Sequence, residues 1–419
     1  MDIHMLQKID INWQNLPSDL FIDIYEIAQE IGIHKIAIVG GFVRDILLRS
    51  NKQDNLINSK DLDLVVEGSA PELALAIKNK LGKERAIEIC IHSDFNTAEI
   101  KIDNFPVDLA SARSEIYLKP GDNPKIKRCS LNEDLRRRDF TINAMAIDLS
   151  NMELLDPYGG KTALLNKEIQ FLHPKSVEED PTRVIRAARY SARFLFNLTP
   201  QDLEQVQSTL LSWPWAWKQG DSFDYVPPAL GSRLRMELER LFNQEPWEVA
   251  FSFLQSWGGL VLLDTYIQED QYLKRRIRWA FRLGLKPLTA LLVGSKNSLT
   301  LAKRLQLSKQ QQDLIDQSEI IKKFLLKSTV KNEYLCWSPS QWTSIIESQN
   351  WHPDAVALAI CNANPMWRKL LKWWNRWRFI KSPISAKELI KIGWEPGPKL
   401  GKHLQKLRRE KLDNYKNQY

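Results

Sequence analysis

The chain has few of the residues that build disulfides, zinc sites or membrane spans. Its 419 residues include only four cysteines (Cys90, Cys129, Cys336 and Cys361), which are dispersed and form no CxxC pair. We therefore expect reduced, mostly buried thiols rather than disulfides or zinc ligands. No apolar run of about 18 residues and no apolar signal-peptide segment occurs, which argues against a membrane span or secretion. The predicted localisation is cytoplasmic.

Histidine is scarce as well. The six histidines are scattered and none precedes an aspartate, so an appended phosphohydrolase domain of the HD type is not expected. At 419 residues, with 43% hydrophobic residues, the chain is nonetheless long enough for about two to four domains with apolar cores.

Positive charge is concentrated at the C-terminal end. The whole chain carries a net charge of +8, yet residues 361–419 hold 15 Lys and Arg residues against four Asp and Glu residues. A basic stretch is often only a solvated surface. This one also contains five tryptophans, and cationic side chains beside aromatic rings suit a polyanion whose bases can stack. We therefore expect RNA as a partner. Most of the 15 tryptophans of the chain are expected in helical cores, and only a few of those in this segment near RNA: Trp367, Trp373, Trp374, Trp377 and Trp394.

The hydrophobic pattern changes along the chain from α/β to almost wholly helical. An amphipathic helix within residues 16–32 precedes short strand-like runs, and residues 69–82 read as a helix with Ser69 as N-cap. From Ser176 onward the pattern is helical, with breaks near 213–228, 294–298 and 338–352. The expected strands are Lys35–Val39, Leu62–Glu67, Ala86–His92, Thr97–Ile102, Pro106–Ala110 and Ala144–Leu149.

Three carboxylates form the first candidate site. Asp61 and Asp63 alternate on a predicted strand, so both side chains point to one face of the sheet. Asp108 lies on a later strand that can run beside theirs. Carboxylates that converge in this way need cations between them, and a two-metal displacement uses such an arrangement. Alone, an Asp-x-Asp pair is more often a solvated strand end, but the neighbouring motifs favour the metal site.

A Gly-Gly turn lies upstream of these carboxylates, within the sequence "VGGFVRD". Gly40 and Gly41 can offer backbone N–H groups to phosphate oxygens at a strand-to-helix turn. Arg44, one turn into the helix, adds a charge-assisted contact that Asp45 can orient. The alternative is an ordinary strand–turn–helix connection.

The segment "LRRRDFTINAMAIDL" places arginines and Asp139 ahead of an apolar run. Arg137 and Arg138 cannot both face the core. We expect one of them to point at a triphosphate, with Asp139 holding that arginine or the ribose. A surface charge run is the alternative.

The segment "EEDPTRVIRAARYSARF" predicts a helix that reads a base. Pro181 suits a first helical turn, so Asp180 lies near a helix N-terminus, one turn from Arg183. A carboxylate accepts from the amino group of cytosine or adenine, and a guanidinium donates to the adjacent ring nitrogen. Guanine and uracil present mismatched groups, so the pair selects C and A without a template. The alternative is an ordinary surface ion pair; Arg186 and Arg189 follow on the same side.

These segments resemble, in order, the class II tRNA nucleotidyltransferase/poly(A) polymerase family of the polymerase-β-like superfamily. The matching blocks are "VGGFVRD", "DLDLVV", "RRDFTINAMA", "LDPYGGKTAL" and "EDPTRVIRAARYSARF", with "LGSRLRMELERLF" and "IGWEPGPKLGKHLQKLRRE" further on. The resemblance is strong over residues 35–200, patchy over about 245–385, and returns at the end. It implies an α/β nucleotidyltransferase head with a polymerase-β-like mixed sheet, followed by an all-α neck, body and tail.

The family assigns roles to matching positions of this chain. It implies that Asp61 and Asp63 bind Mg²⁺ and that Asp108 assists them in catalysis. It implies nucleotide binding by a set of glycines, arginines and one further carboxylate: Gly40, Gly41, Arg44, Arg138, Asp180, Arg183, Arg186 and Arg189.

The family architecture also implies domain limits. An N-terminal helical leader would span 1–28, the head 29–150, the nucleotide-selecting neck 151–225, the body 226–365, and a basic tRNA-binding tail 366–419. Residues 114–132 correspond to a loop that the family uses in passing from C to A addition. Their sequence does not specify whether C, A or both are added.

The predicted function is template-independent addition of C and/or A to tRNA 3′ ends from CTP and ATP, with release of pyrophosphate. A poly(A) polymerase is the nearest alternative; the absence of a long basic extension after the tail motif argues against it. A catalytically inactive RNA-binding relative is the other, disfavoured because each expected site position carries a competent side chain. Oligomeric state is not specified by the sequence.

Overall fold

The computed structural model describes residues 18–50, 62–218, 220–330, 336–362 and 366–414. These residues fall into two compact units. The first comprises described residues within Met1–Asp221, Pro227–Arg233 and Glu245–Gly259, and the second those within Ser222–Val226, Leu234–Gln244 and Leu260–Tyr419. Among the described residues, no helix is both long enough and apolar enough to cross a membrane.

The first unit is built on a seven-stranded mixed sheet, as expected from the sequence. Its strand order is β3-β4-β5-β2-β1-β8-β9. β2 and β5 run parallel, and the other neighbouring strands are antiparallel. The strands are β1 (Ile36–Val39), β2 (Leu62–Val66), β3 (Ala86–His92), β4 (Thr97–Ile102), β5 (Phe105–Ser111), β8 (Ala146–Asp148) and β9 (Leu154–Leu155).

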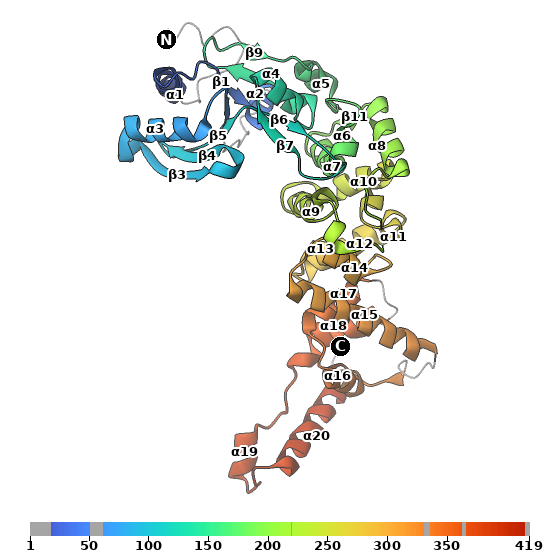
Figure 1. The fold of residues 1–419 in the computed structure, drawn as a ribbon. Helices are drawn as coiled ribbons and strands as arrows, with labels where there is room; N and C mark the ends of the chain where they lie inside the picture. The colour runs from blue at the N-terminus through green and yellow to red at the C-terminus, as the bar shows by residue number, and fades with distance from the viewer. Residues whose placement is uncertain (1–17, 51–61, 219, 331–335, 363–365, 415–419) are drawn as a thin grey trace. The chain divides into compact units, whose positions relative to one another are not determined.

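Central strands of this sheet are apolar, and a helix covers one side. All four residues of β1 are buried. Helix α3 (Ala70–Arg85) contacts β3, β4 and β5, and α1 (Ser18–Glu30) packs on α3 (Figure 1). Ser69 is the N-cap, as predicted, and its hydroxyl accepts from the Glu72 N–H. The helix continues past Gly82 through a kink at a φ of 71°.

Outside the main sheet, the first unit contains a small hairpin and a helical cluster. β6 (Arg113–Ile116) and β7 (Lys125–Arg128) pair antiparallel, and β10 (Glu168–Ile169) pairs with β11 (Asn197–Leu198). None of these four strands was predicted, because each is short and lacks apolar alternation. The helices are α2 (Gly41–Ser50), α4 (Leu131–Arg136), α5 (Gly160–Asn166), α6 (Ser176–Glu179), α7 (Thr182–Phe194), α8 (Pro200–Ser212) and α10 (Trp247–Trp257).

The second unit is helical, as predicted. Its core surrounds α17, which is buried from Ala355 to Cys361. The helices are α9 (Ser232–Gln244), α11 (Thr265–Gln268), α12 (Leu273–Arg282), α13 (Pro287–Leu292), α14 (Ser298–Arg304), α15 (Lys309–Val330), α16 (Pro339–Ser348), α17 (Pro353–Cys361), α18 (Trp367–Asn375), α19 (Ala386–Lys391) and α20 (Pro398–Asn414).

Two expectations about this chain are wrong. The expected break at 338–352 contains helix α16, which a capping box between Ser338 and Gln341 starts and Pro339 supports at its first turn. The cysteines are also not mostly buried, since only Cys361 is, while Cys90 and Cys336 are exposed. Cys90 lies on β3, an edge strand with most residues facing solvent.

Candidate active site

The Gly-Gly turn lies between strand β1 and helix α2, as predicted. Gly40 has a φ of 71°, a left-handed backbone conformation that residues other than glycine adopt only at a cost in free energy. A Cβ on Gly40 would lie 3.2 Å from Arg138 Nη1 and 3.4 Å from Asp63 Oδ2. The turn therefore brings backbone, a cation and a carboxylate to one place. Gly41 begins α2, and a Cβ there would lie 3.3 Å from Arg44 Nη2.

Asp63 and Asp108 are direct neighbours across the parallel strands β2 and β5. Side chains opposite one another in register project from the same face, so the two carboxylates stand side by side at the sheet surface. Asp63 is half-buried and Asp108 is exposed. The prediction that a later strand would bring Asp108 beside Asp63 is confirmed.

Asp61, the third expected carboxylate, lies outside the described residues. Within them, no group of three or more His, Cys, Asp or Glu side chains forms a candidate metal site. The pair Asp63 and Asp108 nevertheless offers hard oxygen ligands, which suit a magnesium ion. The donor chemistry of this sheet face therefore fits the cation that the sequence motif implies.

A buried carboxylate fixes the arginines that face the turn. Asp134 is fully buried; its Oδ1 lies 2.8 Å from Arg137 Nη2, and its Oδ2 accepts from Arg138 Nη2 at 3.1 Å. Burial opposes ionisation, but these two guanidinium groups hold the pKa of Asp134 below its usual range. Arg138 is thus held in place beside the Gly40 turn. The carboxylate that holds Arg138 is therefore Asp134, whereas the sequence pattern indicates Asp139.

Asp139 instead belongs to a network that joins α2 to α7. Its Oδ1 accepts from Asn143 Nδ2 at 2.9 Å, and its Oδ2 accepts from Arg186 Nε at 2.8 Å. Asn143 Oδ1 in turn accepts from Arg44 Nη1 at 2.7 Å. Although Asp139 is buried, the charge of Arg186 keeps the pKa of its carboxyl low.

Arg44 is buried rather than open to solvent. Asp45 pairs with its guanidinium at 2.7 Å, as the sequence indicates. The guanidinium carbon also lies 4.8 Å from the centroid of the Phe194 ring and 5.3 Å from that of Tyr190, both on α7. These contacts hold Arg44 between the Gly-Gly turn and α7.

Asp180 ends α6 and precedes α7, so it lies at a helix N-terminus, as predicted. Its Oδ1 accepts from the Thr182 N–H at 3.0 Å and from the Thr182 hydroxyl at 2.7 Å. Its Oδ2 lies 3.7 Å from Arg233 Nη2. The cation nearest to this carboxylate is thus Arg233, which the sequence pattern does not indicate.

Arg183 and Arg189 are both buried on α7. Arg183 donates to the backbone carbonyls of Ser176 at 3.3 Å and Arg137 at 3.2 Å, and lies 3.8 Å from Glu179. Arg189 donates to the buried Glu245 at 3.3 Å. The structure therefore gives Arg183, Arg186 and Arg189 of α7 different partners, so their shared side of the helix does not give them a shared role.

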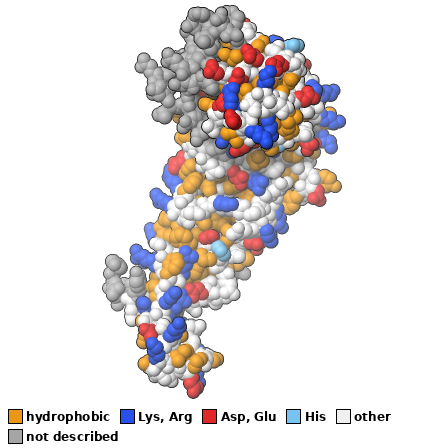
Figure 2. Space-filling model, turned by 90° about the vertical axis from the view of Figure 1, so that its left-hand side faces the viewer, with side chains coloured by type: hydrophobic (Ala, Val, Ile, Leu, Met, Phe, Trp, Pro, Cys, Tyr) orange, Lys and Arg blue, Asp and Glu red, His pale blue; other side chains and the backbone are white. Residues whose placement is uncertain are grey.

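The basic C-terminal segment is only partly a surface for stacking. Trp373 and Trp377 are 3% and 5% exposed and belong to the core of the second unit, in line with the expectation that most tryptophans pack in helical cores. Trp394 stacks on His403 with centroids 4.3 Å apart. Figure 2 shows basic side chains among hydrophobic ones in the lower part of the view.

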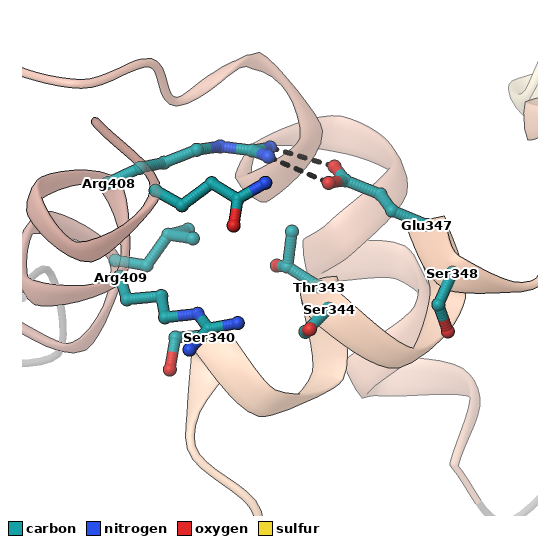
Figure 3. Close-up of a pocket in the computed structure, with 9 residues that line it drawn as sticks. Ser340, Thr343, Ser344, Glu347, Ser348, Arg408 and Arg409 are labelled. Atoms are coloured by element: carbon teal, nitrogen blue, oxygen red, sulfur yellow. Dashed lines mark hydrogen bonds and ion pairs between the residues drawn. The ribbon is translucent and has the colours of Figure 1, made fainter. Parts of the chain in front are cut away.

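A polar cavity of about 250 Å³ lies between α16 and α20 (Figure 3). Arg408 spans it and donates to both oxygens of Glu347, at 2.7 and 2.8 Å. Its Nε also donates to the Ile380 carbonyl at 2.7 Å. This pairing fixes α20 to the rest of the second unit. The hydroxyl groups that line the cavity belong to Ser340, Thr343, Ser344 and Ser348.

Sequence reasoning missed Asp134, Asn143 and Arg233. Asp134 follows a capping box between Ser130 and Glu133, so its position near the start of a helix was readable. Its spacing of three and four residues from the next arginines was a second signal. Asn143 and Arg233 stand in segments that match family blocks, but their contacts are with residues distant in the chain.

The comparisons with known proteins agree with this geometry. Residues 36–170 match the family described as the poly A polymerase head domain. An A-adding tRNA nucleotidyltransferase of Aquifex aeolicus is 45% identical over 166 residues, which cover 39% of this chain and 19% of that protein. A CC-adding tRNA nucleotidyltransferase of Deinococcus radiodurans is 38% identical over 233 residues, 55% of each chain. The chain thus spans about half, or less, of these relatives.

A solved structure shows that the fold extends beyond the head. The Thermotoga maritima CCA-adding enzyme, complexed with tRNA_CCA, superimposes with a TM-score of 0.69. The match covers 99% of this chain and 95% of that one at 24% sequence identity, so it speaks for the fold alone. The α/β head followed by helices is confirmed. Over residues 36–170, then, the chain is similar to the poly A polymerase head domain, and over a longer stretch it is similar to part of the A-adding and CC-adding tRNA nucleotidyltransferases.

Proposed function

We propose that the protein is a template-independent tRNA nucleotidyltransferase that adds C and/or A to tRNA 3′ ends. The observation that carries this proposal is the meeting of Gly40, Arg138 and Asp63 at one turn, with Asp108 in register beside Asp63. A turn without a Cβ, a fixed guanidinium and paired carboxylates are the parts that a metal–triphosphate site needs.

The reaction joins the RNA 3′-oxygen to the α-phosphorus of CTP or ATP. The bond between the α-phosphorus and the bridging oxygen breaks, and pyrophosphate leaves. In this chain, Gly40 and Gly41 would let the backbone approach the phosphates. Arg138, held by its ion pair with Asp134, would donate hydrogen bonds to the negatively charged phosphate oxygens. Because Arg138 is held before the nucleotide arrives, little reorganisation is needed on binding.

Asp63 and Asp108, with Asp61, would hold Mg²⁺. When bound there, magnesium supplies positive charge that offsets the triphosphate and the departing pyrophosphate. The chain's own contribution is the register of β2 and β5, which sets the carboxylates side by side. Asp108 is the more exposed of the two.

Nucleotide choice would lie with the segment that joins α6 to α7. Asp180 carries an oxygen that does not contact Thr182, and that oxygen can accept from the amino group of cytosine or adenine. Arg183, held on backbone carbonyls beside it, supplies the donor for the ring nitrogen. Arg44 and Arg186 would support the site through Asp139 and Asn143, and Arg189 through Glu245.

The acceptor would be tRNA in the cytoplasm, with the basic segment 366–419 as a contact for its backbone. This part of the proposal follows from the charge of +11 over residues 361–419 and from the tRNA named for the Thermotoga protein. The head, neck, body and tail limits of 29–150, 151–225, 226–365 and 366–419 belong to the same proposal.

Three tRNA transcripts test this function, ending at the discriminator base, at C, and at CC. Each is incubated with Mg²⁺ and labelled CTP or ATP, and the products are separated at single-nucleotide resolution. Addition of CC, of A onto CC, or of all three in sequence identifies the specificity. Long untemplated A tracts on any RNA would instead indicate a poly(A) polymerase.

Asp63→Ala is the matched inactive variant. We expect turnover to fall by more than about 10³-fold while tRNA binding, measured by filter retention, stays unchanged. RNA binding without turnover in the unmodified protein would favour an inactive RNA-binding relative.

A further inference from the structure

The Asp180 carboxylate is held from two sides. Its Oδ1 accepts two hydrogen bonds from Thr182, at 2.7 and 3.0 Å, and Thr182 is itself buried. Its Oδ2 faces the guanidinium of Arg233 at 3.7 Å. One oxygen is therefore bound to Thr182, and the other faces Arg233.

The same guanidinium reaches the tip of the β6–β7 hairpin. Arg233 Nη2 donates to the carbonyl oxygens of Gly121 at 3.4 Å and Asp122 at 3.3 Å. Both carbonyls belong to the connection between β6 and β7. A single side chain thus contacts the hairpin tip and Asp180.

The hairpin tip sits in a place that only glycine fits. Gly121 donates its N–H to the Glu179 carbonyl at 3.0 Å, and its own carbonyl accepts from the Ala229 N–H at 3.1 Å. A Cβ at Gly121 would lie 2.8 Å from Trp215 Cδ1, and its φ is 76°. Trp215 is buried and donates from Nε1 to the Glu178 carbonyl at 3.0 Å.

Tyr117, which directly follows β6, has several charged neighbours. The Tyr117 hydroxyl donates to Glu115 Oε2 at 3.3 Å. Burial raises the pKa of Tyr117 far above its usual value, and the nearby charges of Glu115, Asp180, Arg183 and Arg233 act on it as well. Tyr117 is therefore an uncharged neighbour of Asp180 and Arg233. Arg233 remains the cation that faces Asp180 Oδ2.

We propose that Arg233 is a positioning residue for nucleotide selection: it orients the base-reading oxygen of Asp180 and does so only while the hairpin tip is seated on Glu179 and Trp215. The proposal rests on the function proposed above, because Asp180 must read the base. In this arrangement, two side chains hold the two oxygens of the Asp180 carboxylate. Thr182 fixes Oδ1, and Arg233 fixes the direction of Oδ2 while leaving it a lone pair for the amino group of C or A.

The test compares nucleotide selectivity in Arg233→Gln with that of the unmodified enzyme. The readout is the ratio of kcat/KM for CTP over UTP and for ATP over GTP, on the tRNA end that the enzyme extends. We expect these ratios to fall by about tenfold, since an ångström-scale misplacement of a site group has effects of this size or larger. Arg233→Lys keeps the charge but not the fork geometry, and should restore only part of the selectivity.

Arg235→Gln is the matched control on the same helix, because Arg235 donates to the Gln306 carbonyl and contacts neither the hairpin nor Asp180 in the described structure. Selectivity should stay unchanged in that variant. An equal loss of kcat/KM for all four nucleotides in Arg233→Gln, or unchanged ratios, would overturn the proposal. Melting temperatures of both variants separate a folding defect from a change in selectivity.

Gly121→Ala tests the dependence on the hairpin without touching Arg233. Its Cβ would displace the tip from Trp215, so we expect the same loss of selectivity and faster tryptic cleavage after Lys125, which is exposed on β7. The double variant should lose no more selectivity than either single one. Additive losses would refute the coupling. An unmodified enzyme that adds neither C nor A would instead refute the proposed function itself.

Discussion

At the scale of single residues, buried carboxylates decide where the arginines of the site point. Asp134 holds Arg137 and Arg138, while Asp139 holds Arg186. The sequence shows a run of arginines next to acids, but it does not show which acid takes which arginine. That choice depends on burial and on residues far away in the chain, so the run could be predicted to matter while its pairing could not.

Asp139→Asn should lower stability at neutral pH and flatten its dependence on acid pH. The folded pKa of Asp139 lies below the ordinary value of about 3.9, so its contribution is present above that pH and is lost as the pH falls through the folded pKa. We expect the variant to lose about 2 kcal/mol of unfolding free energy at pH 7, with a smaller difference from the unmodified protein near pH 3. Urea unfolding at several pH values from 7 to 3 measures the loss of unfolding free energy at pH 7 and the smaller difference near pH 3.

Asp103→Asn is the control for that measurement. Asp103 pairs with Arg85 at 2.7 Å, but both side chains are well exposed, so solvent and salt screen the pair. An equally steep acid dependence in Asp139→Asn and the unmodified protein would show that another carboxylate is responsible.

At the scale of elements, the connection between β1 and α2 depends on one glycine conformation. Gly40→Ala would place a methyl group against Arg138 and Asp63 at a φ of 71°. The backbone conformation alone costs about 1 kcal/mol for alanine. We expect kcat/KM to fall by about 100-fold because the displaced groups are those proposed to meet the triphosphate.

Gly159→Ala separates backbone strain from displacement of the site. Gly159 has a φ of 72°, nearly the value of Gly40, yet nothing lies within 4 Å of the place its Cβ would take. Both variants should therefore lose similar stability in thermal melts, and only Gly40→Ala should lose activity. Equal losses of activity would mean that the Gly40 turn acts through general stability.

The elements that the sequence predicts well are those with a strong local signal. β1 is an apolar run before a Gly-Gly turn, and α3 begins at a predicted N-cap. The hairpin β6–β7 has no such signal, since all residues of β7 are exposed, and its place is set by contacts of Gly121 with distant residues. Helix α16 was expected to be a break in the helical pattern, although its capping box is a local signal that could be read from the sequence. Tertiary contacts therefore explain the place of the hairpin, but not the missed helix.

At the scale of the whole molecule, positive charge is separated along the chain from the site that would do the chemistry. The C-terminal residues carry the excess of Lys and Arg, while the head presents the carboxylates proposed to hold the metal. In the proposed function, this division would let a long polyanion bind by its backbone at one part of the chain while its end reacts at another. Affinity for RNA should then depend on salt more than on the sequence of the RNA.

Replacing Lys402 and Lys406 together by alanine tests this division. Both are exposed on α20. We expect weaker tRNA binding and a plot of log Kd against log salt that is shallower by about 0.9 for each phosphate that the variant no longer neutralises. The paired control is Lys80→Ala with Lys83→Ala, exposed on α3. Identical salt dependence in the two double variants would place the RNA-binding surface away from α20.

The parallel pairing of β2 with β5 has a consequence for folding. The chain between these strands contains α3 and the antiparallel strands β3 and β4, so Asp63 and Asp108 are distant in the sequence although they are neighbours in the sheet. Pairings between distant segments are entropically costly to close and form slowly. We therefore expect the two carboxylates to meet late in folding, so that a growing chain acquires its candidate metal-binding face only after the outer strands are already in place.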